Sequence, residues 1–335
     1  MYAIEDMTTH IRRRGAALYR ANDLTVSLIA RQRPELLEIT LESIAQTSPS
    51  DVVLQVLLNP PQDDVSEVVR RFGMRWPGTF KVLSTSTPLN FVDAHNLALE
   101  QVETPLVNFM GDDDVNIGPR LSRQLDFLNT ETDVLACGTY AYRVGGRPGQ
   151  KLKVGGRSAI GPSTRDACNA LVASGQLIYL SFPSVVAQTK ALLSIGGFRK
   201  EFSIASDVDL WTRLASLGPV LSIPEYLFGF RIHDASGSTA LFWEGEERTR
   251  FAQACAKARS QGVAEPTLDE WRQASNEERP MTKWRTRRRS ASRFYFRRAG
   301  AAFVERRYPT TARYLVTSFF LSPGSCLSKL HGQLG

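Results

Sequence analysis

The sequence predicts an α/β protein: a mixed, mostly parallel sheet flanked by helices, with a helical, basic region at its C-terminal end. Three observations carry this prediction. Short apolar runs alternate with helical patterns in the first part of the chain, three aspartates follow one predicted strand, and arginines gather late in the chain. Buried strands that alternate with helices form mostly parallel sheets.

The first β-α-β unit is predicted from two apolar runs and the segment between them. LTVSLIA (24–30) and VVLQVLL (52–58) are too continuous for half-exposed strands. Such runs are typical of strands covered on both faces. Between them, Pro34 can open a helix in which apolar residues recur at helical spacing.

The same alternation continues along the chain. We expect strands over 80–85, 105–110 and 134–144, a helix over 92–102, and a further helix that begins at Pro119. In sheets of this kind, ligands bind beyond the carboxyl ends of the strands.

The later part of the chain is less regular. The Gly-rich stretch over 145–163 predicts a mobile loop, and SDVDLWTRLASLG (206–218) predicts a helix. Two short strands, VLSIP and LFGFRIH, follow. From about residue 241 the chain is predicted to form helices rich in arginine and aromatic residues.

The positive charge belongs to the late part of the chain. Residues 283–313 hold eleven Lys or Arg and only one acid, Glu305, a net charge of +10, so the remainder of the +7 chain sums to −3. Three interpretations stay open for this region: helices packed on the rest of the protein, contact of 281–313 with an anionic membrane surface, or nucleic-acid binding. The acidic remainder disfavours nucleic acid.

Cysteine spacing and hydropathy bear on localisation. The four cysteines are far apart, which predicts neither a disulfide framework nor a zinc site and favours a reducing cytosol. The start of the chain does not read as a secretory signal, and YLVTSFFL (314–321) is too short to span a bilayer. We expect a cytoplasmic protein, with peripheral attachment to the cytoplasmic membrane face as an option.

The stretch NFMGDDDVNIGPR (108–120) places Asp112, Asp113 and Asp114 directly after a predicted buried strand. Adjacent carboxylates repel unless a cation or proton neutralises them. A divalent ion bound to a phosphorylated ligand would do so, and a solvated acidic turn in which Asp112 caps the next helix is the alternative.

Two further signals are weak when each is taken alone. Asp207 and Asp209 precede a helix, where they can favour its dipole, or one of them can serve as a general base. His233, at the end of a predicted strand, can be a residue of the surface or core without a functional role, or it can be a metal ligand.

Four ordered blocks together are more specific, and the chain resembles the inverting, nucleotide-sugar glycosyltransferases of family 2. The blocks are VSLIARQRPELLEITLESIAQT, NFVDAHNLALEQVETPLVNFMGDDDV, SVVAQTKALLSIGGFRKEFSIASDVDLWTRLASLG and FRIHDASGST. The resemblance spans roughly residues 24–240 and implies the GT-A (Rossmann-like) fold. We therefore expect an N-terminal extension over 1–22, a catalytic domain over 23–240 and a basic helical region over 241–335.

The resemblance also implies roles for particular residues. Asp207 would be the catalytic base, and a Mg²⁺ or Mn²⁺ ion would be held by Asp114 with Asp112 or Asp113, and by His233. The donor-binding residues that it implies are Ala30, Arg33, Asn59, Asn96, Asp112, Asp113 and Arg231.

The chain departs from the family pattern at two donor-side positions. Asn59 stands where the family has an aspartate that pairs with the nucleotide base, and His95 replaces an arginine next to Asn96. These departures leave the nucleotide undetermined and permit a rival function, a non-catalytic scaffold that binds a sugar nucleotide. The function that the resemblance implies is transfer of a sugar to an acceptor hydroxyl on a glycan or a lipid-linked acceptor, in surface glycan or polysaccharide synthesis.

Overall fold

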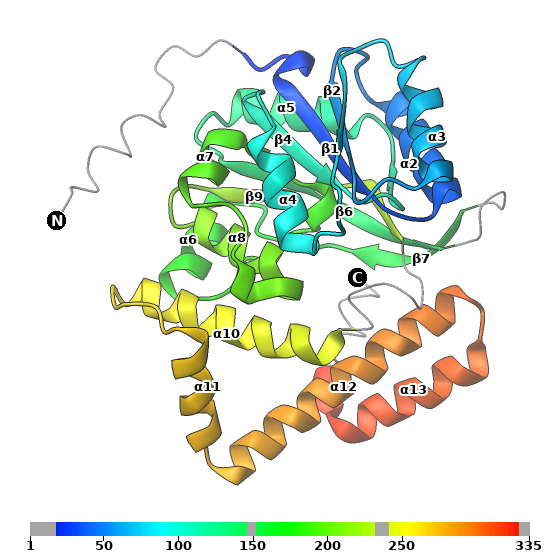
Figure 1. Cartoon of the computed structure of the whole chain (residues 1–335). Helices are drawn as coiled ribbons and strands as arrows, with labels where there is room; N and C mark the ends of the chain where they lie inside the picture. The colour runs from blue at the N-terminus through cyan, green and yellow to red at the C-terminus, as the bar shows by residue number, and fades with distance from the viewer. Residues whose placement is uncertain (1–17, 146–151, 232–240, 328–335) are drawn as a thin grey trace.

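A computed structural model describes residues 18–145, 152–231 and 241–327, in which a mixed sheet is covered by helices and followed by a helical region (Figure 1). The strands are β1 (Leu24–Ala30), β2 (Val53–Leu58), β3 (Phe80–Ser84), β4 (Leu106–Met110), β5 (Val115–Asn116), β6 (Ala136–Gly145), β7 (Lys153–Ser158), β8 (Val186–Gln188) and β9 (Val220–Arg231).

Helices fill most of the connections between the strands. In the sheet-forming part they are α2 (Pro34–Thr47), α3 (Asp63–Gly73), α4 (Phe91–Glu100), α5 (Arg120–Thr130), α6 (Arg165–Ala173), α7 (Thr189–Ser194) and α8 (Ser206–Leu214), with short 3-10 turns η1 (Ala21–Asp23), η2 (Phe182–Ser184) and η3 (Lys200–Ala205). The helices after β9 are α10 (Phe242–Ser260), α11 (Leu268–Glu277), α12 (Pro280–Val304) and α13 (Tyr308–Leu321).

The strand order confirms the predicted mixed α/β fold. The order is β3-β2-β1-β4-β8-β6-β9-β5, with β7 paired to β6. β3, β2, β1 and β4 pair in parallel, as do β6 and β9, whereas β8, β7 and β5 join antiparallel. The carboxyl ends of the first four strands therefore meet at one edge of the sheet.

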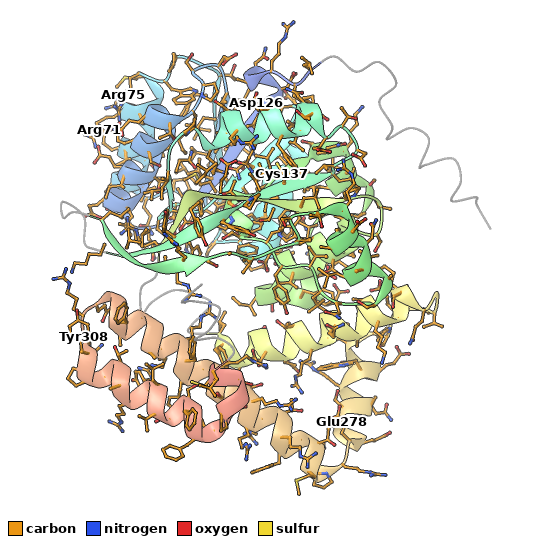
Figure 2. The ribbon with its side chains drawn as sticks, turned by 180° about the vertical axis from the view of Figure 1, so that it is seen from behind. Arg71, Arg75, Asp126, Cys137, Glu278 and Tyr308 are labelled. Carbon is orange, nitrogen blue, oxygen red and sulfur yellow. The ribbon has the colours of Figure 1, made fainter. Side chains whose placement is uncertain are left out.

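The core lies between the sheet and its helices. β1 and β4 are buried almost throughout, because helices cover both of their faces. α2 begins at Pro34 and turns Leu37, Leu41 and Ile44 toward the sheet. Seen from behind in Figure 2, Cys137 of β6 lies inside the sheet region, while Arg71 and Arg75 of α3 lie on its outer side.

Two predictions for the later strands are wrong in detail. Residues 153–158, predicted as part of a mobile loop, form β7 beside β6. The two strands predicted on either side of Pro224 are one strand, β9, whose pairing with β6 shifts register near Tyr140. The proline is tolerated at such an irregularity because it needs no ladder hydrogen bond there.

The helices after β9 form a separate layer beside the sheet. α10 packs on η3 and α8, and its residues Phe251 and Cys255 share a buried cluster with Phe202 and Val208. α12 and α13 run antiparallel as a hairpin, with α12 nearer to β7 (Figure 1). In the described part of the chain, no helix is both long and apolar enough to cross a bilayer.

Candidate active site

The parallel strands bring the predicted donor-side residues to one edge of the sheet. Ala30, the last residue of β1, lies opposite Leu58 of β2, and Leu28 lies opposite Met110 of β4. Ala30 is fully buried, and its carbonyl oxygen accepts a hydrogen bond of 2.9 Å from the Asn59 amide. The loops that begin after these strands therefore start side by side.

Arg33 joins two members of the acidic triplet. Its guanidinium donates to Oδ1 of Asp112 and to Oδ2 of Asp113, each at 2.7 Å. The backbone of Arg33 is left-handed, with φ 68°, where it precedes α2. That unusual conformation for a non-glycine residue directs the side chain across the sheet edge toward the triplet. Asp112 does not cap the next helix, since Pro119 precedes α5.

Asp114 is held from the other side of the site. Its Oδ1 accepts 2.9 Å from the backbone amide of Arg231 at the end of β9, and its carbonyl oxygen accepts 2.8 Å from Thr40 Oγ1. Arg231 Nε also donates to the Asp113 carbonyl, at 2.7 Å. A Cβ at position 111 would lie 2.5 Å from Asp114 Oδ2, so glycine is required for this close approach.

Burial raises the pKa of two carboxyl groups of the triplet, those of Asp112 and Asp114. Burial raises the pKa of Asp112 to about 7, Arg33 opposes that shift, and Asp113 adds to it. The pKa of Asp114 is raised well above its ordinary value, first by burial and then by Asp113. A bound cation would lower both pKa values, because it favours the ionised form.

The donor set of the triplet fits a divalent ion. Its ligand atoms are carboxylate oxygens, which Mg²⁺ and Mn²⁺ accept, and Mg²⁺ commonly keeps waters beside one or two protein carboxylates. Across the described ranges, three or more acidic, His or Cys side chains are nowhere grouped as ready metal ligands. His233, the third predicted ligand, lies outside the described residues.

Asn59 is occupied by the protein backbone. Its Oδ1 accepts from the Leu89 amide at 2.7 Å, and its Nδ2 donates to the Leu89 carbonyl at 3.0 Å. Thr85 Oγ1 also donates to Asn59 Oδ1, at 3.2 Å. The side chain thus ties the loop after β3 to the end of β2, and its predicted contact with a nucleotide base stays a prediction.

Asn96 is engaged in the same way. Its Oδ1 accepts 2.9 Å from the Phe198 amide, and its Nδ2 donates 2.8 Å to the Phe198 carbonyl. Gly197, with φ 62°, gives Asn96 the space it needs, since a Cβ there would lie 2.6 Å from Oδ1. Asn96 therefore fastens α4 to the segment before α8, and its role in donor binding also stays a prediction.

His95 belongs to an aromatic cluster. Its ring lies 3.9 Å from that of Phe91 and 5.4 Å from those of Phe109, Phe182 and Phe198, measured between centroids. Burial lowers the pKa of His95 to about 4, so the ring is neutral near pH 7 and its Nδ1 donates 2.7 Å to the Phe91 carbonyl. A neutral, buried ring does not replace the positive charge of an arginine.

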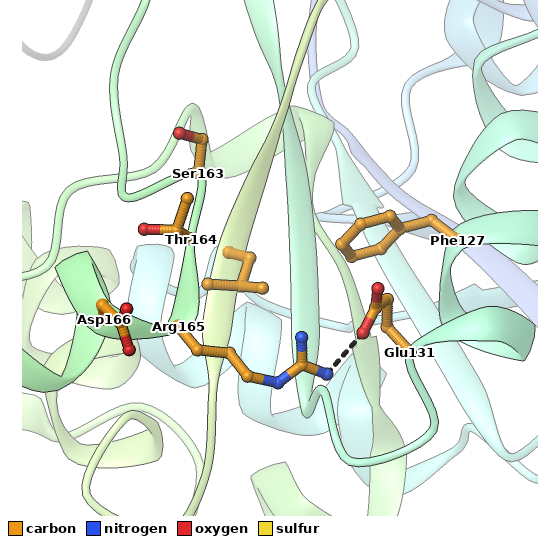
Figure 3. Close-up of a pocket in the computed structure, with 7 residues that line it drawn as sticks. Phe127, Glu131, Ser163, Thr164, Arg165 and Asp166 are labelled. Carbon is orange, nitrogen blue, oxygen red and sulfur yellow. Dashed lines mark hydrogen bonds and ion pairs between the residues drawn. The ribbon is translucent and has the colours of Figure 1, made fainter.

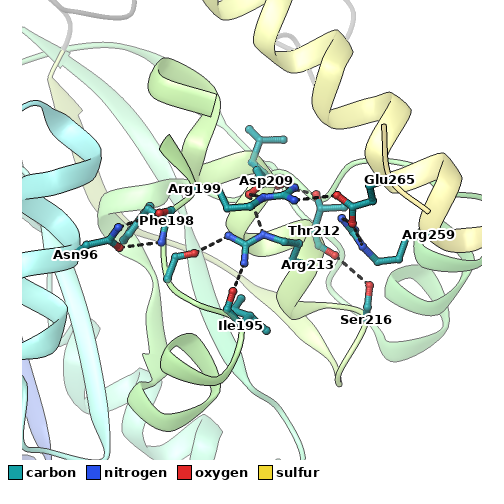
Figure 4. A network of polar contacts seen from close by, with 12 residues as sticks. Asn96, Ile195, Phe198, Arg199, Asp209, Thr212, Arg213, Ser216, Arg259 and Glu265 are labelled. Carbon is teal, nitrogen blue, oxygen red and sulfur yellow. Dashed lines mark hydrogen bonds and ion pairs between the residues drawn. The ribbon is translucent and has the colours of Figure 1, made fainter. Parts of the chain in front are cut away.

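Asp209 belongs to a network of ion pairs (Figure 4). Arg199 Nε and Arg213 Nε donate to its Oδ2 at 3.0 and 2.8 Å. Arg213 also donates to the carbonyl oxygens of Ile195 and Gly197, at 2.6 Å each. Because Arg199 Nη2 also donates to Oδ1, both oxygens of Asp209 are bound by arginines and hold the start of α8 against the preceding segment.

Asp207 lies in the same helical turn as Asp209, but no arginine pairs with it among the described residues. Its carboxylate accepts backbone hydrogen bonds from its own amide and from that of Val208, which lower its pKa, but burial outweighs them and raises that pKa to about 6. A carboxylate with this pKa is ionised at neutral pH and is a stronger proton acceptor than an ordinary aspartate.

Three residues near Asp207 were not predicted as part of the site. Burial raises the pKa of Tyr179, Arg293 opposes the shift, and the charges of Glu246 and Asp207 add to it. Glu246 of α10 pairs with Arg293 of α12 and accepts 2.6 Å from Ser290 Oγ. The helices beyond β9 thus lie beside the part of the candidate site that contains Asp207. No local sequence pattern predicted this arrangement.

One depression lies apart from all of these residues (Figure 3). It has a volume of about 370 Å³ and is lined by Phe127, Glu131, Ser163, Thr164, Arg165, Asp166 and Leu221. Arg165 pairs with both Glu131 and Asp133, so its charge is already neutralised within the protein. None of the predicted site residues lines it.

Comparison with known proteins finds a family match and a curated relative. Residues 25–173 match the family Glycosyl transferase family 2. The amylovoran biosynthesis glycosyltransferase AmsE of Erwinia amylovora is 25% identical over 210 residues, which cover 62% of this chain and 74% of AmsE.

Two solved structures have a similar fold. S. aureus TarS 1–349 in complex with UDP aligns at 13% identity with a TM-score of 0.51, over 92% of each chain. The mannosyltransferase PcManGT from Pyrobaculum calidifontis, in complex with GDP-Man and Mn²⁺, aligns at 14% identity with a TM-score of 0.51, over 96% of this chain and 86% of its own. At these identities the likeness concerns the fold alone.

The family match and AmsE define the class of the protein as a glycosyltransferase, and the solved structures show that its fold is GT-A-like. More particularly, residues 25–173 resemble a glycosyl transferase family 2 domain. The prediction that the protein is an enzyme of the glycosyltransferase class is confirmed by the family and by AmsE.

Proposed function

We propose that the protein is an inverting glycosyltransferase that moves a sugar from a nucleotide-diphosphate sugar to an acceptor hydroxyl, in surface glycan or polysaccharide synthesis. The observation that carries the proposal is the buried carboxylate cluster at the end of β4, bridged by Arg33 within a glycosyl transferase family 2 domain. AmsE, named for amylovoran biosynthesis, supports the polysaccharide role.

The donor would bind where the first four strands end. Asp114, with Asp112 or Asp113, would hold a Mg²⁺ or Mn²⁺ ion, and His233 would add a ligand. When bound, the ion stabilises the negative charge of the departing diphosphate as a Lewis acid. Arg33 and Arg231 would supply positive charge to the diphosphate, since a guanidinium matches phosphate oxygens in two-point contacts.

The acceptor would bind on the side of Asp207. As the acceptor oxygen attacks the anomeric carbon, Asp207 takes the hydroxyl proton, and the bond from the anomeric carbon to the diphosphate breaks on the opposite face. This in-line displacement inverts the anomeric configuration without a covalent enzyme intermediate. Asp209 is unsuited to the same role, because two arginines already hold its oxygens.

The acceptor would be a glycan or a lipid-linked glycan presented at the cytoplasmic face of the membrane, and contact of 281–313 with an anionic membrane surface belongs to the same proposal. Nucleic acid is not expected as a partner, because the sheet-forming part of the chain is not basic.

A thermal-shift screen of UDP- and GDP-sugars with and without Mn²⁺ tests the donor half of the proposal. A ligand that binds the folded state stabilises it by RT ln(1 + [L]/Kd) and so raises the melting temperature. We expect one sugar nucleotide to do so only when Mn²⁺ is present. A flat response to every donor would contradict the proposal.

A further inference from the structure

The exposed face of α13 is apolar. The side chains of Val316, Phe319 and Phe320 are exposed to 55%, 42% and 77%, and they recur at helical spacing along one stripe. Pro309 and Ala312 extend the stripe toward the start of the helix, with Arg313 the one charged residue among them. A helix in water normally turns such residues inward.

The buried face of α13 is made of small, polar residues instead. Thr311, Ser318 and Ser322 are buried there, opposite Ser292 of α12. Ser292 Oγ donates 2.8 Å to the Ser318 carbonyl, and Ser318 Oγ donates 2.9 Å to the Ser292 carbonyl. The two helices thus associate in part through hydroxyl groups, and Val316, Phe319 and Phe320 of α13 remain outside this contact.

Positive charge surrounds this apolar stripe. Arg306 and Arg307 are exposed in the turn between α12 and α13, and Tyr308, at the outer edge of the hairpin in Figure 2, follows them. The first turns of α12 extend beyond the end of α13 toward α11 (Figure 1). They are exposed and contain Lys283, Arg285, Arg287, Arg288 and Arg289. Over α12 and α13 together, Glu305 is the one acidic residue.

We propose that the α12–α13 hairpin docks on an anionic phospholipid surface, with Val316, Phe319 and Phe320 inserted among the lipids and the arginines on the headgroups. The apolar stripe would contact the acyl chains of the lipids, and the flanking arginines would contact their anionic headgroups. Each basic residue near an anionic membrane adds roughly 1 kcal/mol to binding.

Other occupants match the hairpin less well. A second copy of the chain would bring two hairpins of equal positive charge together, which like-charge repulsion opposes. An RNA would be attracted by the arginines, and Phe319 and Phe320 could stack on its bases. The aliphatic part of the stripe, Val316, Pro309 and Ala312, offers bases neither stacking surfaces nor hydrogen bonds, whereas lipid chains can cover all of it. An anionic membrane satisfies both the charge and the apolar stripe.

The hairpin is connected to the segment around Asp207 through α12. Arg293 of α12 pairs with Glu246, whose charge acts on Tyr179 together with that of Asp207. This step rests on the proposed function: a hairpin bound to lipid would hold Asp207 near the membrane, where a lipid-linked acceptor is found.

Vesicle flotation tests the docking directly. Full-length protein is mixed with phosphatidylcholine vesicles, either pure or with about 30 mol % phosphatidylglycerol. The test variant is Phe319→Ser with Phe320→Ser, and the matched control is Met74→Ser with Val82→Ser, which removes exposed apolar side chains from the sheet-forming part. All four substituted positions are exposed, and melting temperatures check that both variants fold.

We expect the wild type and the control to float with the anionic vesicles and not with the neutral ones, and to be released at high salt. The test variant should bind anionic vesicles at least about tenfold more weakly. Equal flotation of the test variant and the control, flotation with neutral vesicles alone, or binding of single-stranded RNA in place of vesicles would overturn the proposal. Sugar-nucleotide binding should be the same in all three proteins. A failed donor screen would therefore contradict the proposed function, whereas a failed flotation would contradict only the membrane docking.

Discussion

Asp207 and Asp209 lie in the same helical turn but in different surroundings. Asp209 is 2% exposed between Arg199 and Arg213, while Asp207 accepts only backbone hydrogen bonds at the start of α8. The sequence could place both aspartates before a helix, but it could not separate them, because the arginine partners of Asp209 are set by the fold of the segment before α8.

The pH dependence of transfer should report Asp207. Burial raises its pKa to about 6, and a general base must be ionised. At saturating Mn²⁺, which keeps Asp112 and Asp114 ionised, kcat/KM should therefore be constant above that pH and fall about tenfold per unit below it. In Asp207→Asn, transfer should drop by roughly 10²–10⁴-fold. A wild-type profile that stays flat down to pH 4.5 would contradict the assignment.

The two aspartates should differ in their effects on stability. Asp209→Asn breaks buried ion pairs and should lower the free energy of unfolding by about 3–5 kcal/mol. Asp207 binds its proton more tightly in the folded than in the unfolded protein, so its ionisation costs stability as pH rises from about 4 to about 6. Asp207→Asn should therefore be more stable by about 1–2 kcal/mol at pH 7. Urea unfolding at pH 7 measures both changes, and destabilisation of equal size in the two variants would refute this distinction.

At the scale of elements, the turn after β4 depends on the absence of a side chain at Gly111. In Gly111→Ala the new Cβ would lie 2.5 Å from Asp114 Oδ2 and push the carboxylate from its place. Donor binding in the presence of Mn²⁺ should weaken about tenfold or more, since metal ligands tolerate small displacements poorly. Gly324→Ala is the matched control, because nothing lies within 4 Å of a Cβ there. Calorimetric titration of the two variants should separate them, and identical affinities would rule out this role for Gly111.

The elements of the parallel half of the sheet could be predicted because each has a recognisable pattern in its own stretch of sequence. β1, β2 and β4 are continuous apolar runs, and Pro34 marks the start of α2. β7 was missed because its two glycines and exposed positions resemble a turn-rich loop. β9 was divided in two because Pro224 normally interrupts a strand.

The site was predictable only in part, for a related reason. The acidic triplet stands next to a strand in the sequence, whereas the hydrogen bonds that occupy Asn59 and Asn96 reach the backbone of Leu89 and Phe198 in other segments. α3 was not predicted either, although Val65, Val68, Val69 and Phe72 are buried along it at helical spacing. Local patterns thus predict strand ends better than the partners that meet there.

At the scale of the whole molecule, the helices after β9 pack against the segment that carries Asp207. Phe251 and Cys255 of α10 pack on Phe202 and Val208, the residue after Asp207. A chain that stops at residue 240 should expose this cluster and lose both several degrees of melting temperature and transfer. A chain that stops at residue 278 keeps α10 and α11 and should melt close to the wild type while it loses flotation with anionic vesicles. Scanning calorimetry compares them, and equal melting of all three forms would show that α10 is dispensable.

The central claim is that Asp114 and Asp207 act on one bound sugar nucleotide, Asp114 on its metal-dependent binding and Asp207 on the transfer. Calorimetric titration with the donor found in the screen, with and without Mn²⁺, tests this claim most directly in the wild type, Asp114→Ala and Asp207→Asn. We expect Asp207→Asn to bind the donor as the wild type does without transferring it, and Asp114→Ala to lose the Mn²⁺-dependent part of the affinity. Unchanged Mn²⁺-dependent binding in Asp114→Ala, or wild-type turnover in Asp207→Asn, would contradict it.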